Sequence, residues 1–104
     1  MLTRIEEIIL LGVHQLADNA YGLQIRKHVE HATGRRFSIG AIYVPLERLT
    51  RQGFLKSYEG DPTPTRGGRR KRYYEVTPEG LFALAEIRRL HEKLWADVPD
   101  LETK

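Results

Sequence analysis

The first stretch of the chain reads as a helix that is apolar on nearly every side. Thr3 and Glu6 stand at the spacing of a capping box, and the residues that follow place isoleucine, leucine and valine all around the predicted helix. The dipeptide Asp18-Asn19 ends it. Because the core of so small a domain covers one side of a helix, we expect the other side to pack on a second subunit.

Two further helices follow at the same apolar spacing. One runs from about residue 21 to residue 33 and ends at Gly34, and its expected inward positions are Leu23, Ile25, Val29 and Ala32. Ser38 caps the next, over residues 39–52, and Gly53 ends it. Pro45 lies inside this third helix and predicts a kink. Its buried set should be Ile39, Ile42, Leu46 and Leu49, which leaves Ser38, Gly40, Ala41, Tyr43, Val44, Glu47, Arg48 and Arg51 outward.

Aromatic and β-branched residues next predict a β-hairpin with strands at residues 54–58 and 72–76. The segment between them, GDPTPTRGGRRK, is a loop because of its prolines and glycines. Thr77-Pro78 then starts a helix of about twenty residues that Pro99 ends. The pattern predicts a mainly α fold with a small β-hairpin: a winged helix-turn-helix domain over residues 1–76, continued as one structural unit by a dimerisation helix and tail over residues 77–104.

Positive charge is concentrated in the middle third of the chain. The net charge is +3, yet residues 35–72 alone hold ten basic and three acidic residues. Five cations fall within residues 66–72, at the predicted hairpin tip, and their mutual repulsion favours a polyanionic partner. The sequence has no cysteine, no apolar run of membrane-spanning length and no basic signal-peptide start. We therefore expect a cytoplasmic protein without membrane contact or cofactor.

These features assign residues to the two parts of a DNA interface. A recognition helix needs small residues where its first turn meets base edges, and Ser38, Gly40 and Ala41 meet this need. Tyr43 and Val44 would then reach bases or thymine methyl groups, although Ser38 as a mere helix cap and Tyr43 as a packing residue stay open. Gly67 and Gly68 would let the wing approach the duplex, and the expected phosphate contacts are Arg48, Arg51, Lys56, Arg66, Arg69, Arg70, Lys71 and Arg72.

Several short sequence motifs follow one another in a definite order over residues 2–96. They include Tyr21-Gly22, Ser38-Ile39-Gly40, Leu46-Glu47-Arg48-Leu49, Gly53-Phe54-Leu55, Arg66-Gly67-Gly68-Arg69-Arg70 and Thr77-Pro78-Glu79-Gly80. In this order the chain closely resembles the PadR family of bacterial transcriptional regulators, in its short subclass with a single C-terminal dimerisation helix. The resemblance implies that Tyr43 and the wing arginines contact DNA. It also implies repression that is relieved by small aromatic or drug-like molecules bound near the dimer interface. Pro45 departs from the pattern, because many relatives place proline directly after the tyrosine.

The first and last helices are the expected dimer interface. A two-fold dimer presents two recognition helices about one DNA turn, roughly 34 Å, apart, and so matches a pseudo-palindromic operator on double-stranded DNA. Trp95 is in addition a candidate for stacking on a planar effector, the alternative being that it seals the dimer. The residues expected at this interface are Ile5, Ile8, Ile9, Leu84, Ile87, Leu94 and Trp95.

Two other functions fit parts of the sequence. His28 and His31 fall on one helical face and, with His91 or Glu30, suggest a metal-responsive winged helix. A winged helix that binds protein and not nucleic acid is the second alternative. An enzyme is not expected, because the sequence has no paired carboxylates, nucleophile elbow or phosphate-binding loop.

Overall fold

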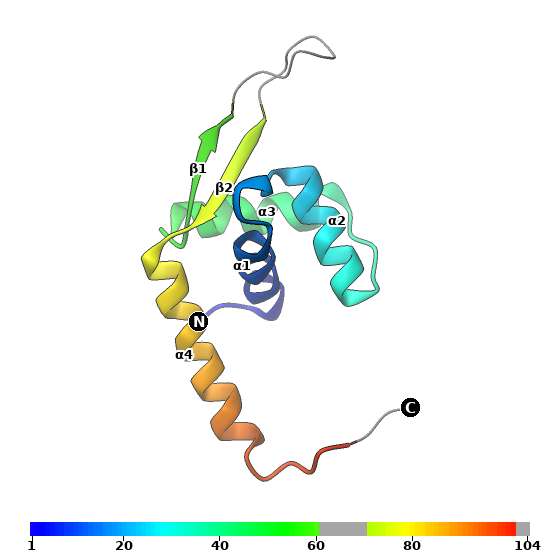
Figure 1. The fold of residues 1–104 in the computed structure, drawn as a ribbon, viewed down its shortest axis with the longest axis vertical. Helices are drawn as coiled ribbons and strands as arrows, with labels where there is room; N and C mark the ends of the chain where they lie inside the picture. The colour runs from blue at the N-terminus through cyan, green and yellow to red at the C-terminus, as the bar shows by residue number, and fades with distance from the viewer. Residues whose placement is uncertain (61–70, 102–104) are drawn as a thin grey trace.

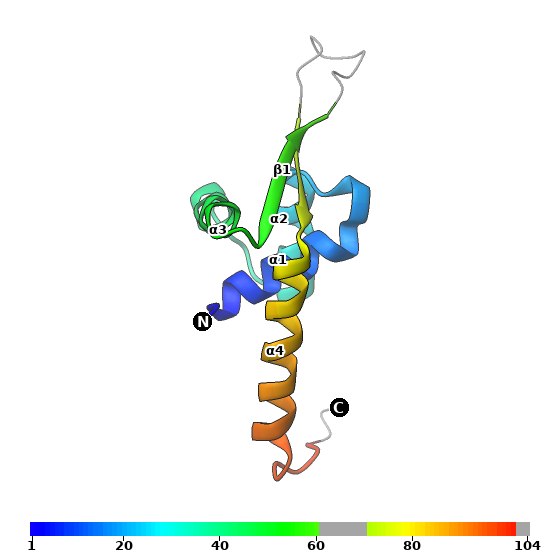
Figure 2. The ribbon, with the colours of Figure 1, turned by 90° about the vertical axis from the view of Figure 1, so that its left-hand side faces the viewer.

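The computed structural model describes residues 1–60 and 71–101 and folds them into four α-helices and a β-hairpin (Figure 1). The expected mainly α fold with a small hairpin is confirmed. The hairpin and the last helix extend from the body in opposite directions (Figures 1 and 2). In chain order the elements are α1 (Arg4–Leu16), a 3₁₀ turn (Ala17–Asn19), α2 (Gly22–Thr33), α3 (Ile39–Arg51), β1 (Leu55–Glu59), β2 (Arg72–Val76) and α4 (Pro78–Trp95).

Side-chain caps set the starts of three helices where the sequence predicts them. At α1 the backbone N–H of Glu6 donates to the Thr3 hydroxyl at 3.2 Å, and the Thr3 N–H donates to the Glu6 carboxylate at 2.9 Å. Ser38 and Thr77 cap α3 and α4 in the same way, each accepting a backbone N–H three residues on. The ends of these helices differ from the predicted ones by at most a few residues.

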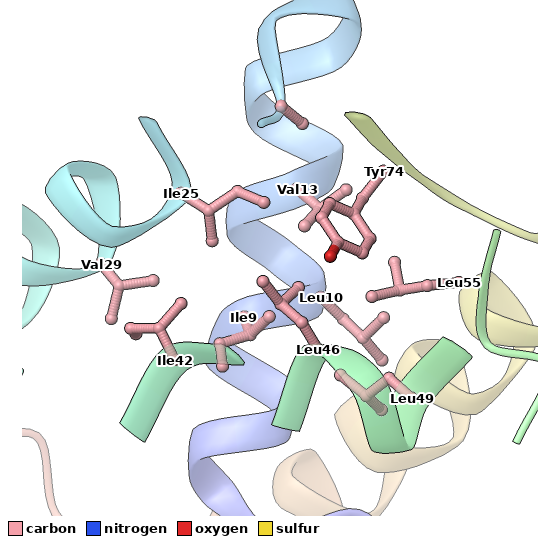
Figure 3. Close-up of a cluster of buried hydrophobic side chains, with 11 residues drawn as sticks. Ile9, Leu10, Val13, Ile25, Val29, Ile42, Leu46, Leu49, Leu55 and Tyr74 are labelled. Carbon is pink, nitrogen blue, oxygen red and sulfur yellow. The ribbon is translucent and has the colours of Figure 1, made fainter. Parts of the chain in front are cut away.

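The core forms around α1, which lies between the other two helices and the hairpin (Figure 3). Isoleucine, leucine and valine side chains from α1, α2 and α3 meet there, and Tyr74 and Leu55 close the core from the strands. Burial of these side chains is the main source of stability for the fold. The eleven core residues are Ile9, Leu10, Val13, Ala20, Ile25, Val29, Ile42, Leu46, Leu49, Leu55 and Tyr74.

The hairpin is tied to the turn between α1 and α2. Its strands are antiparallel, with Leu55 opposite Val76. The N–H of Tyr74 donates to the carbonyl oxygen of Ala20 at 2.8 Å, and Tyr21 and Tyr73 form an isolated bridge. The base of the hairpin is therefore held by the helical body as well as by its own strand pairing.

Three predicted core positions are wrong. Leu23 and Ala32 of α2 and Ile39 of α3 are exposed, whereas Pro45 is buried. The buried face of α3 follows Ile42, Pro45, Leu46 and Leu49, because only this face rests on α1 and the hairpin. Ile39 shares their spacing but lies in the first turn, which no described element covers. The helix is continuous through Pro45, and a kink there stays a prediction.

Most of α4 stands clear of the body (Figure 2). Leu84 packs on the core, and Gly80 is the one residue of this fully described helix that is buried. Within the part of the chain that the structure describes, no helix is long and apolar enough to cross a membrane.

Candidate nucleic-acid interface

The first turn of α3 presents small, exposed residues. Ser38, Gly40 and Ala41 are all exposed, and a side chain at Gly40 would enter open space. The Ser38 hydroxyl accepts the N–H of Ala41 at 3.1 Å, so its role as a helix cap is confirmed. Another molecule could therefore approach the backbone of this turn closely.

Tyr43 lies on the same helix and packs against α2. Its hydroxyl and ring sit over Gly22, where any Cβ would collide with them. The side chain is nevertheless 38% exposed, so it packs on a neighbouring helix and also reaches the surface. The sequence motif Tyr21-Gly22 includes this glycine, but helical spacing alone does not explain why the residue at this position is a glycine.

Exposed apolar side chains surround Tyr43. Leu23 is 50% exposed, Ile39 60% and Val44 56%. Leu23, Ile39 and Tyr43 line one shallow hollow of about 450 Å³, together with Gly22 and Arg26. We call Leu23, Ile39, Tyr43 and Val44 the apolar patch.

The stem of the hairpin carries ordered cations. Lys71 places its Nζ 4.3 Å from the centre of the Tyr21 ring, and the Arg72 guanidinium donates to the Ser57 hydroxyl at 3.0 Å. Lys56 pairs with Glu75 across the strands at 3.7 Å. Lys56 and Arg72 are thus held by partners within the hairpin, and Lys71 by the ring at the start of α2.

Three tyrosines stiffen the same stem. The Tyr73 ring stacks on Tyr58 at 5.7 Å and meets the edge of Tyr21 at 5.4 Å. A hydrogen bond from Gln24 holds the pKa of Tyr21 below its ordinary value of 10.0, and Lys71 lowers this pKa further. Ring contacts thus link the hairpin to the start of α2.

Arg48 and Arg51 occupy different environments on α3. Arg51 is exposed, whereas the Arg48 guanidinium donates to the buried carboxylate of Glu6 at 2.8 Å. Arg48 therefore serves to hold α3 on α1, and its contact with phosphate stays a prediction. The predicted wing residues Arg66, Gly67, Gly68, Arg69 and Arg70 lie outside the described residues.

The predicted dimer residues fall into three groups. Ile9 is completely buried inside the protomer, so its place at a subunit interface is wrong: the core uses the face of α1 that carries it. Ile5, Ile8 and Leu84 are half-buried against the core, whereas Leu94 and Trp95 are largely exposed on the free part of α4. Between α4 and the start of the chain lies a hollow of about 590 Å³, lined in part by Leu2, Phe54, Ile87 and Leu90.

The histidines do not gather into a metal site. His28 lies 2.6 Å from the side-chain oxygen of Gln15, His31 is exposed, and His91 lies 3.5 Å from Glu7. Over residues 1–60 and 71–101, no three histidine, aspartate or glutamate side chains come together as metal ligands. The metal-responsive alternative therefore has no support in this part of the chain.

Comparison with known proteins decides the family. The model of the transcriptional regulator PadR-like family matches residues 10–86. The chain belongs to this family. PadR-family proteins are DNA-binding transcriptional regulators and not enzymes, so this chain is a transcriptional regulator.

Individual relatives agree with the family match. The transcriptional regulator Rv3488 of Mycobacterium tuberculosis is 36% identical over 87 residues, which are 83% of this chain and 77% of that protein. A transcriptional regulator from Clostridium thermocellum is 27% identical with a TM-score of 0.67, over 92% of this chain and 93% of its own. A PadR-like transcription factor from Bacteroides fragilis shares the fold with a TM-score of 0.75 at 24% identity, over 90% and 85% of the two chains.

The PadR match spans every element of the candidate interface. It begins within α1, takes in α2, α3 and both strands, and ends at residue 86, inside α4. The exposed front of α3, the apolar patch and the cationic stem all lie within it. In this PadR-family chain, the match therefore covers the helix-turn-helix, the hairpin and the first half of α4, and the free end of α4 lies beyond it.

Proposed function

We propose that this PadR-family regulator binds DNA as a homodimer, with α3 of each protomer in the major groove of a pseudo-palindromic operator and each wing on flanking phosphates. Residues 1–76 are then the DNA-binding part and residues 77–104 the dimerisation part. The observation that carries the proposal is the first turn of α3. Its small exposed residues leave room for base edges, and Tyr43 and Val44 follow them on the same helix.

The free part of α4 supports a second copy as the partner. Helices in proteins are stabilised mainly by tertiary packing of their apolar side chains, yet α4 leaves Phe82, Leu90, Leu94 and Trp95 exposed. An equivalent helix from another protomer would bury them and fill the hollow beside Leu2 and Phe54. Two-fold pairing would then present two copies of α3 to one duplex.

Repression follows if the operator overlaps a promoter, because a bound dimer would exclude the polymerase. Relief by a small aromatic or drug-like effector would act through Trp95, whose side chain is 63% exposed and available for stacking. An effector needs only to favour one spacing of the two DNA-binding parts to change affinity. Quenching of Trp95 fluorescence by planar compounds, absent in Trp95→Leu, would support this site; equal binding to Trp95→Leu would remove it.

Selection of bound duplexes from a random library by the purified protein tests the DNA-binding proposal. We expect a symmetric motif with half-sites about one turn apart, and an affinity that falls about 10³-fold between 50 and 200 mM salt if about six phosphates are neutralised. Arg51→Gln and Lys71→Gln should each flatten the salt dependence. The matched control is Arg88→Gln, which removes an exposed charge from α4. Failure to bind any duplex would overturn the proposal.

The dimer is tested separately by sedimentation. Leu94→Glu places a charge on the exposed apolar side of α4 and should shift the protein toward monomer while the core of the helical body stays folded. Arg88→Gln is again the control and should leave the mass unchanged. A wild-type monomer at micromolar concentration would contradict the dimer.

A further inference from the structure

Attraction to phosphates explains the basic residues of the proposed DNA-facing surface, and close approach to base edges explains the small ones. Neither explains the apolar patch. Four large apolar side chains stand exposed at the starts of α2 and α3, and three of them share one hollow. Their side chains remain between 38% and 60% exposed, even though Tyr43 also packs on Gly22. Exposed apolar clusters of this kind mark contact surfaces, because each side chain retains burial free energy that contact can release.

The charges around the patch indicate its occupant. Arg26 lines the hollow itself, and Lys27, Arg35 and Arg36 lie on the adjoining turn of α2 and on the segment before α3. The acidic residues nearby in sequence are Glu30, which pairs with Arg26, and Glu47. The charged residues that neighbour the patch in the sequence are therefore net positive. A second copy of the chain would bring the same charges against them, whereas a polyanion would neutralise them.

The chemistry of the major groove indicates which base edge the apolar patch would contact. Guanine, cytosine and adenine present only hydrogen-bond donors and acceptors there, while thymine also presents a methyl group. Leucine, isoleucine and valine side chains have no polar atoms, so contact with a polar base edge would leave that edge desolvated and unpaired. The 5-methyl group of thymine is the groove feature that these side chains complement.

We infer that the apolar patch reads thymine methyl groups, with Ile39 and Val44 of α3 as the specificity-determining contacts and Leu23 of α2 at their side. This inference rests on the proposed DNA-binding function. It assigns to Leu23 and Ile39 a role in recognition, and it makes thymine a requirement at defined positions of each half-site. Gly40 and Ala41 allow α3 to come close enough for such contacts.

Replacement of thymine by deoxyuridine tests the inference, because it removes the methyl group and nothing else. In the operator obtained by selection, each thymine of a half-site is replaced singly, and symmetrically in both half-sites. At the contacted position we expect affinity to fall about fourfold per methyl group and more than tenfold for the symmetric pair. Cytosine and 5-methylcytosine at the same position form a further arm, which shows whether the methyl group is recognised outside a thymine.

Variants connect the effect to the patch. Ile39→Ala and Val44→Ala should each bind the thymine operator more weakly and lose part or all of the difference between thymine and deoxyuridine. Both side chains are outside the core, so thermal unfolding should stay within a few degrees of the wild type. Val98→Ala is the matched control: it makes the same truncation as Val44→Ala at an exposed position beyond the end of α4, and it should keep the full difference.

The outcomes separate this inference from the proposed function. Full affinity for deoxyuridine at every thymine would overturn the inference and leave DNA binding intact. No binding to any duplex would overturn both. A change of oligomeric mass on Ile39→Ala would show that the patch joins copies of the chain, and would also overturn the inference.

Discussion

The guanidinium Nη1 of Arg48 lies 2.8 Å from the carboxylate Oε2 of Glu6, and this pair joins α3 to the first turn of α1. The Glu6 side chain is only 5% exposed, and its other oxygen accepts the N–H of Thr3. Burial by itself raises the pKa of Glu6, but the Thr3 N–H and the Arg48 guanidinium outweigh it and hold the pKa below the ordinary value of 4.5. One carboxylate thus caps α1 and anchors α3.

Replacement of this carboxylate should destabilise the protein. Glu6→Gln removes the charge that Arg48 faces, and we expect the free energy of unfolding to fall by about 1–3 kcal/mol, since Arg48 is partly exposed and regains water. Chemical denaturation at fixed protein concentration measures the change. Glu92→Gln is the matched control, because it breaks an exposed pair on α4 and should change stability by less than about 0.5 kcal/mol. Equal effects of the two variants would contradict the anchoring role.

The same contact gives stability a pH dependence of known sign. The folded-state pKa of Glu6 is lowered, so its contribution is complete above the ordinary value of 4.5 and is lost as the pH falls through the lower folded value. Wild type should therefore lose its stability advantage over Glu6→Gln on acidification from pH 6 to pH 3. Denaturation of both proteins at a series of pH values checks this. A constant difference over that range would contradict the assignment.

Gly22 controls the position of Tyr43. In Gly22→Ala the new methyl group collides with the Tyr43 ring and hydroxyl, and the ring has to swing outward because it is the exposed end of a flexible side chain. We expect a small change in stability, below about 1 kcal/mol, but a clear loss of operator affinity. In a Tyr43→Ala background, Gly22→Ala should cost no further affinity. Additive losses in the double variant would show that Gly22 acts independently of Tyr43.

The sequence predicts where helices start, but it does not predict which face of a helix is buried. Helix starts at Thr3, Ser38 and Thr77 follow from bonds made within three residues, so local sequence determines them. Whether Ile39 is buried depends on which element lies opposite, and helical spacing is the same for a covered and an uncovered turn.

For the same reason, the pattern of apolar residues does not predict contacts between residues that are far apart in the sequence. Arg48 and Glu6 are forty-two residues apart, and the outward spacing of Arg48 by itself predicts a phosphate contact. The core position of Ile9 likewise depends on α1 being enclosed by three other elements, which an all-round apolar helix does not reveal. For Tyr43, by contrast, helical spacing correctly predicts a surface position, but only the structure shows that it packs against Gly22.

Gly40 allows stability and DNA binding to be separated in one substitution. It lies in the first turn of α3, in a helical conformation, and a Cβ there would point into open space, with no described atom beyond its own helical turn within 4 Å. Alanine is favoured over glycine in a helix by up to about 1 kcal/mol, so Gly40→Ala should leave stability unchanged or raise it. The added methyl group would nevertheless stand on the surface that faces the base edges and hold α3 away from them. Operator affinity should therefore fall about tenfold or more.

Denaturation and operator titration of the same preparation measure the two effects. Binding to random-sequence duplex depends on phosphate contacts, so it serves as the internal control and should change less. If stability rises and operator affinity does not fall, then the first turn of α3 does not approach the bases, and the geometry proposed for the complex is wrong.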